Sequence, residues 1–81
     1  MSNAEKDYAL PESVAAAVAA GTNIVRALRE SMGYSVEDLA LTCGLATGEI
    51  GAIEAGNDAD PARLRRIASA LGLPERALAG G

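Results

Sequence analysis

The side chains that could carry chemistry in this chain are charged rather than nucleophilic. The 81 residues include no histidine and one cysteine, so neither a nucleophile–base pair nor a set of zinc ligands can be assembled. Asp58 and Asp60 alternate in the segment "NDAD", but the other ligands of a calcium loop are missing. We therefore expect no enzyme activity, no metal and no cofactor.

Positive charge gathers late in an acidic chain. The net charge is −4 and the isoelectric point about 4.6, which argues against a general nucleic-acid coat protein and against binding to an anionic membrane surface. Arg63, Arg65, Arg66 and Arg76 form the one basic cluster of the sequence. These arginines can contact phosphate, or they can form a solvated face that offsets nearby acids. The sequence leaves both interpretations open.

The composition favours packed helices. Hydrophobic residues make up 49% of the chain without any Phe or Trp, so the core must consist of Leu, Ile, Val and Ala. No segment approaches the ~20 apolar residues of a membrane span, and no membrane association is expected. Cys43 stands among apolar neighbours and is interpreted as a small buried hydrophobe, which fits a reducing cytoplasm. We expect a compact all-α bundle of five to six helices in the cytoplasm.

The first two helices are predicted from turn residues and apolar spacing. Residues 1–10 are expected to be a flexible N-terminus, and 11–79 a single domain. Pro11 suits the first position of a helix that stops at Gly21. Its apolar stripe should be buried by the next helix or by a second copy of the chain, and consists of Leu10, Val14 and Val18. A helix capped by Thr22 or Asn23 follows and ends at Gly33, with Val25, Leu28 and Met32 facing inward.

The later helices are equally short. Ser35 opens one of them, and Asp38 can return a bond to the Ser35 amide as in a capping box. Asp60 is predicted to cap a helix that starts at Pro61 and ends at Gly72. Its inward residues are predicted to be Leu64, Ile67, Ala68 and Leu71. Pro74 begins a last short helix that reaches Leu78.

Residues 35–56 have the pattern of a helix-turn-helix. Two short helices are joined by a turn that contains Gly44, and the small Ala40 permits their close crossing. Ile50 and Ile53 anchor the second helix. With this motif, the chain resembles the helix-turn-helix domain of lambdoid phage repressors and Cro proteins, the XRE family. The stretches that carry the resemblance are "VRALRESMGYS", "LALTCGL", "IGAIEAG" and "PARLRRIASALGL". Relative to this family, the chain has an extra helix at its N-terminus.

The resemblance implies a DNA-binding transcriptional regulator. In the family the second motif helix, here about residues 46–55, lies in the major groove. Carried over to this sequence, the DNA-binding positions are Val36, Ala46, Thr47, Gly48, Glu49, Gly51, Ala52, Asn57, Arg63 and Arg66. The resemblance also implies that Arg29 pairs with Glu54. Because Ala46 stands where the family has a Ser or Thr cap, we expect Thr47 to be drawn into capping.

Several positions depart from the family's pattern. Val36, Thr47 and Gly48 stand where long polar side chains are common, and direct readout of adenine or guanine needs a two-pronged side chain. Acidic Asp58 and Asp60 occupy a loop that is often basic. We expect double-stranded DNA to be bound weakly per subunit, by a homodimer. The alternative is an antitoxin-like or accessory protein-interaction module, with DNA affinity weak or lost and a protein partner such as a toxin.

Overall fold

The computed structural model describes residues 10–74 and 76–79, all of whose regular structure is helical. The predicted all-α fold is confirmed. Residues 1–9 of the expected flexible terminus lie outside the described range. The helices are α1 (Glu12–Ala19), α2 (Ile24–Ser31), α3 (Val36–Cys43), α4 (Thr47–Glu54), α5 (Pro61–Leu71) and the short α6 (Arg76–Ala79).

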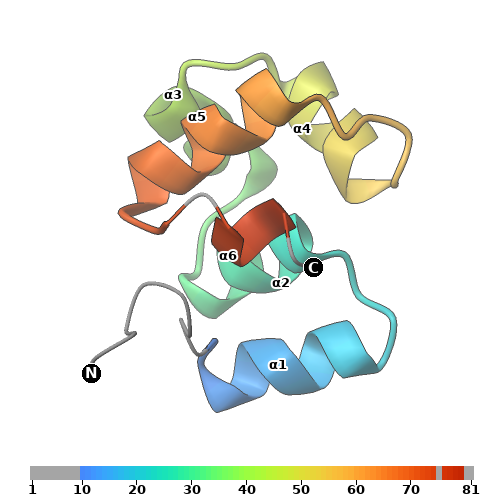
Figure 1. Ribbon diagram of the computed structural model, residues 1–81. Helices are drawn as coiled ribbons and strands as arrows, with labels where there is room; N and C mark the ends of the chain where they lie inside the picture. Colours follow the sequence, from blue (N-terminus) through green and yellow to red (C-terminus); the bar gives the residue numbers. More distant parts are fainter. Residues whose placement is uncertain (1–9, 75, 80–81) are drawn as a thin grey trace, which may run out of the picture.

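The helices form two groups that share one core. In Figure 1, α3, α4 and α5 lie together above α2, and α1 lies below α2. The short α6 contacts α5. The core runs through both groups and is entirely aliphatic apart from one thiol, as the composition requires. Its fully buried large side chains are Leu28, Leu39, Ile50, Ile53, Ile67, Val14 and Val25.

Helix α1 packs on α2 within the same chain. Val14 is fully buried, and Leu10 and Val18 are partly buried against the core. The predicted stripe is therefore covered by α2, the first of the two alternatives. Pro11 occupies the N-cap position rather than the first helical position, and the helix begins one residue later at Glu12.

Other local predictions are wrong as well, and the first concerns the last helix, which begins at Arg76 rather than at Pro74. Met32 is 41% exposed rather than inward, because α2 ends at Ser31 and the chain turns away at Gly33, whose φ is 73°. Asp60 does stand at the N-cap of α5, but its side chain makes no capping hydrogen bond. The Asp60 carbonyl instead accepts from the Arg63 and Leu64 amides, at 3.1 and 3.0 Å.

Candidate nucleic-acid interface

The two ends of α3 have the capping box and the glycine turn that the sequence predicts. Ser35 Oγ accepts a hydrogen bond from the Asp38 N–H, and Asp38 Oδ2 accepts one from the Ser35 N–H, both at 3.0 Å. This reciprocal box begins α3. The hydrogen bond from the Ser35 N–H is the main reason why the pKa of the Asp38 carboxyl is lowered, and the Ser35 side chain adds to the effect. Gly44 ends α3 with φ 72° and ψ 31°, a left-handed conformation that glycine adopts without steric cost. Ala40, buried beneath the crossing, accepts from the Leu45 N–H at 3.0 Å.

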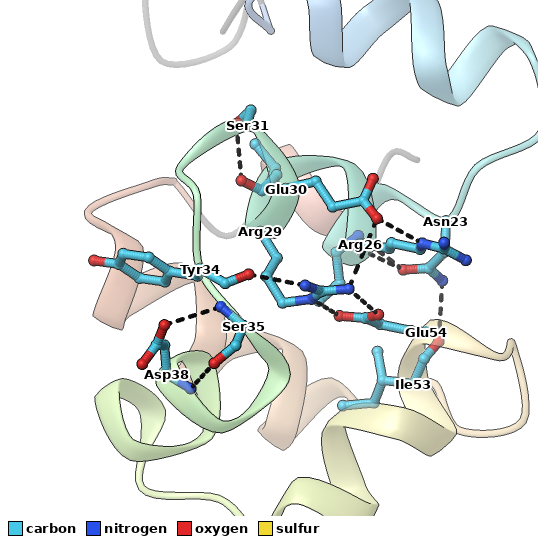
Figure 2. A network of polar contacts seen from close by, with 12 residues as sticks. Asn23, Arg26, Arg29, Glu30, Ser31, Tyr34, Ser35, Asp38, Ile53 and Glu54 are labelled. Atoms are coloured by element: carbon cyan, nitrogen blue, oxygen red, sulfur yellow. Dashed lines mark hydrogen bonds and ion pairs between the residues drawn. The ribbon is translucent and has the colours of Figure 1, made fainter.

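One side of α4 is anchored to α2. Ile50 and Ile53 are buried, and the Ile53 carbonyl accepts a hydrogen bond from Asn23 Nδ2 at 3.0 Å (Figure 2). The Asn23 Oδ1 atom also caps α2 by accepting from the Val25 and Arg26 amides. A single side chain thus ties the start of α2 to the end of α4. The sequence indicated a cap at Thr22 or Asn23, and the structure has it at Asn23. It gave no signal of the second bond, which depends on the packing of the two helices.

The predicted pairing of Arg29 with Glu54 is confirmed. Arg29 Nε and Nη2 donate to the two Glu54 carboxylate oxygens at 2.7 and 3.1 Å, and Nη1 donates to the Tyr34 carbonyl at 2.8 Å (Figure 2). The side chains are only 12% and 10% exposed. The bond to Glu54 is the main reason why the pKa of Arg29 is raised, so the guanidinium remains charged. The fork fixes the angle between α4 and α2.

The other side of α4 offers small side chains to solvent. Thr47, Gly48 and Gly51 are exposed, and Ala52 is partly exposed. An added Cβ at Gly48 or Gly51 would meet no heavy atom within 4 Å, and neither glycine has a positive φ. The fold itself therefore does not require glycine at either position.

The first turn of α4 is capped by Glu49, not by Thr47. Ala46 stands at the N-cap without a side-chain bond, and Glu49 Oε1 accepts from the Ala46 N–H at 2.8 Å. Thr47 is the first helical residue, so the expectation that it would be drawn into capping is wrong. The bond from the Ala46 amide is the main reason why the pKa of Glu49 is lowered, and Arg63 adds to the effect.

The arginines of α5 are engaged within the chain. Arg63 Nε donates to Glu49 Oε2 at 3.0 Å, and its Nη1 donates to Asp58 Oδ2 at 2.6 Å. Arg66 Nη1 donates to the Gly44 carbonyl at 3.3 Å, next to the turn of the motif. Arg65 and Arg66 also line a shallow open groove between α3 and α5, with Thr42 and Ser69. Sequence reasoning did not find the role of Asp58, whose carboxylate lies between two elements.

The remaining predicted positions lie around these helices. Val36 is the first residue of α3 and is partly buried, while Asn57 is exposed in the segment that follows α4. Burial raises the pKa of the Cys43 thiol and keeps it neutral, as expected for a small core residue. No cluster of metal ligands occurs among the residues that the structure describes. None of the described helices is long and apolar enough to cross a membrane.

Helices α3 and α4 are joined by a left-handed glycine turn, and a largely buried ion pair holds α4 to α2, the helix before the motif. This arrangement defines a helix-turn-helix domain. Residues 25–78 match the helix-turn-helix family of lambda repressor-like, XRE-type domains, and the chain belongs to that family of DNA-binding domains. Helix α1 precedes the matched residues. No curated protein and no solved structure matches the chain significantly.

Proposed function

We propose that this protein is a DNA-binding transcriptional regulator that inserts α4 into the major groove as a homodimer. Thr47, Gly48, Gly51 and Ala52 form the reading surface, because they are the residues that α4 presents outward. Asn57 and Arg66 stand at the two ends of this surface, where phosphate contacts would position the helix. Val36 would approach the backbone from the start of α3.

The observation that carries this proposal is the pair of glycines on the exposed side of α4. Glycine in a helix interior costs roughly 0.5–1 kcal/mol relative to alanine. Neither Gly48 nor Gly51 avoids a clash within the chain or adopts a left-handed conformation. No contact within the free protein therefore compensates for the loss of helix stability at these glycines. A binding partner that comes close to the backbone of α4 would explain why no larger side chain stands there. A duplex around a recognition helix is such a partner.

Replacing Gly51 by alanine tests the proposal. Gly51→Ala should raise the free energy of unfolding by about 0.5–1 kcal/mol, since the new methyl group meets no atom within 4 Å. The same variant should bind its operator duplex more weakly, because the methyl group occupies the space into which DNA must come. Ser13→Ala on the exposed side of α1 is the matched control, and should leave DNA affinity unchanged.

A selection from a random duplex library would identify the operator, and fluorescence anisotropy on the selected duplex would then compare the variants. Stabilisation with unchanged affinity would mean that α4 is not the reading helix. Dimerisation is measured in the same samples by sedimentation equilibrium, with and without duplex.

The second candidate function is a protein-interaction module, and one feature favours it. Leu41 on α3 is 83% exposed, an unusual position for a large aliphatic side chain on a small domain. The net charge of −4 also disfavours DNA relative to a protein partner, such as the toxin of an antitoxin-like protein. Leu41→Ser should abolish binding to such a partner and leave duplex binding unchanged.

A further inference from the structure

A network of charged side chains joins three segments at the edge of the candidate interface. Glu49 belongs to the first turn of α4, Asp58 to the segment after α4, and Arg63 to the first turn of α5. Arg63 contacts both carboxylates through different nitrogens, at 3.0 Å and 2.6 Å. We call these three residues the Arg63 clamp. All of them remain partly accessible, with side-chain exposures of 37% for Arg63, 35% for Glu49 and 21% for Asp58.

The carboxylates of the clamp also organise the backbone. Glu49 Oε1 accepts from the Ala46 N–H at 2.8 Å, which caps α4 in the absence of a capping side chain at Ala46. Asp58 Oδ1 accepts from the Asp60 N–H at 3.0 Å, which fixes the entry into α5. Each carboxylate thus uses one oxygen for the backbone and the other for Arg63. The clamp holds the start of the reading helix and the segment after it in one arrangement.

The charges of the clamp make Arg63 a poor phosphate ligand. Its guanidinium faces Glu49 and Asp58, and Asp60 Oδ2 lies 4.0 Å from Nη1. One positive charge therefore lies among three negative ones, and a phosphate that approaches this site meets an excess of negative charge. Association with duplex DNA depends on positive groups that release counterions from phosphates. Arg63 adds no net positive charge for this purpose.

We infer that Arg63 is a positioning residue, which holds Glu49 and Asp58 so that α4 and the segment after it are presented together, and that it contacts no phosphate. The inference rests on the proposed function. It changes the role expected for two residues, since Arg63 is then not a phosphate ligand and Glu49 is a cap rather than a DNA-contacting residue. The fork of a guanidinium reaches two separate carboxylates in fixed directions, whereas the ammonium of lysine is a point charge.

The test compares Arg63→Gln and Arg63→Lys with Arg26→Gln, which removes one arginine that pairs with a neighbouring glutamate on α2. Duplex affinity is measured for each at several salt concentrations. We expect both Arg63 variants to bind several-fold more weakly than the original protein, with the slope of log K against log salt unchanged. Arg26→Gln should leave affinity and slope as they were. If instead Arg63→Gln reduces the slope by about 1 and Arg63→Lys restores it, Arg63 contacts a phosphate and the inference is wrong.

A second measurement needs no DNA and so separates this inference from the proposed function. Titration of the Glu49 carboxyl by NMR should show its pKa higher in Arg63→Gln than in the original protein, because the arginine contributes to its low value. Arg26→Gln should not move it. An unmoved Glu49 titration in Arg63→Gln overturns the clamp even if duplex binds. Conversely, if the pKa of Glu49 is higher in Arg63→Gln but the original protein binds no duplex, the clamp is supported and the proposed function is wrong. Circular dichroism confirms that each variant is folded, and Glu49→Gln, which keeps an acceptor for the Ala46 amide, provides the reciprocal variant.

Discussion

Arg29 and Glu54 form the most buried ion pair among the described residues, and both charges depend on each other. Arg29 also donates to the Tyr34 carbonyl, and its Nη2 lies 3.9 Å from Glu30 Oε2. The loss of Glu54 would therefore leave a largely buried guanidinium with one backbone acceptor and one distant carboxylate. Breaking such a pair from one side costs about 3 kcal/mol. The pair therefore joins the end of α4 to α2 and contributes to the stability of this arrangement.

A double-mutant cycle with Arg29→Met and Glu54→Gln measures this dependence. Each single variant should lower the free energy of unfolding by about 3 kcal/mol, and the double variant by clearly less than the sum of the two. Urea unfolding followed by circular dichroism provides the values. A coupling energy below ~0.3 kcal/mol would show two independent charges.

Two carboxylates with lowered pKa values make the free energy of unfolding depend on pH. The pKa of Asp38 lies below its ordinary 3.8 and that of Glu49 below its ordinary 4.5. Because the folded state lowers them, the stability that they contribute is complete above these ordinary values and is lost as the pH falls through the folded ones. The double variant Asp38→Asn with Glu49→Gln should be less stable than the original protein at pH 7. The difference between their urea midpoints should shrink towards pH 2, and a constant difference would contradict the assigned bonds.

At the scale of elements, the turn at Gly44 sets how α3 presents α4. A Cβ at this position would meet no atom within 4 Å, so the whole penalty of a substitution comes from the positive φ of 72°. Gly44→Ala should therefore lower the free energy of unfolding by roughly 1–2 kcal/mol. Gly51→Ala should change it in the opposite direction, which makes the two variants a matched pair. If Gly44→Ala leaves the free energy of unfolding unchanged or raises it, the turn geometry is not as described.

Helix α1 precedes the residues that match the family, and its apolar stripe packs on α2. Val14 is 1% exposed at the contact with α2. Val14→Ala should cost about 2 kcal/mol, from the lost burial of two carbons and the cavity that they leave. Ala15→Ser, on the exposed side of the same helix, is the control and should change stability by less than ~0.5 kcal/mol. Equal effects of the two substitutions would show that α1 does not pack as a stripe.

The elements themselves could be predicted from sequence because their signals are local. Ser35 with Asp38, and the left-handed Gly44, act within a few residues, and both appear as expected. Arg29 with Glu54 came from the family resemblance and not from spacing. The bond from Asn23 to Ile53 and the contacts of Arg63 join residues that only tertiary packing brings together. For the same reason, the sequence does not predict which arginine side chains pair with carboxylates. This pairing decides whether an arginine can contact a phosphate.

At the scale of the whole molecule, positive charge available to a duplex is scarce. The chain carries 7 basic and 11 acidic residues, and Arg29 and Arg63 are both bonded to carboxylates. A regulator of this kind would bind through close fit at α4 and through dimerisation rather than through a broad basic surface. The salt dependence of binding distinguishes these two modes, because it counts the phosphates that the protein neutralises.

The most direct test of DNA binding is a titration of the intact chain against a random-duplex library at two salt concentrations. We expect that a subset of duplexes is bound and enriched, with a shallow slope of about −2 to −4 in log K against log salt. If the folded protein enriches no duplex even at low salt, α4 is not a reader of DNA. The family fold would then serve the protein-interaction role instead.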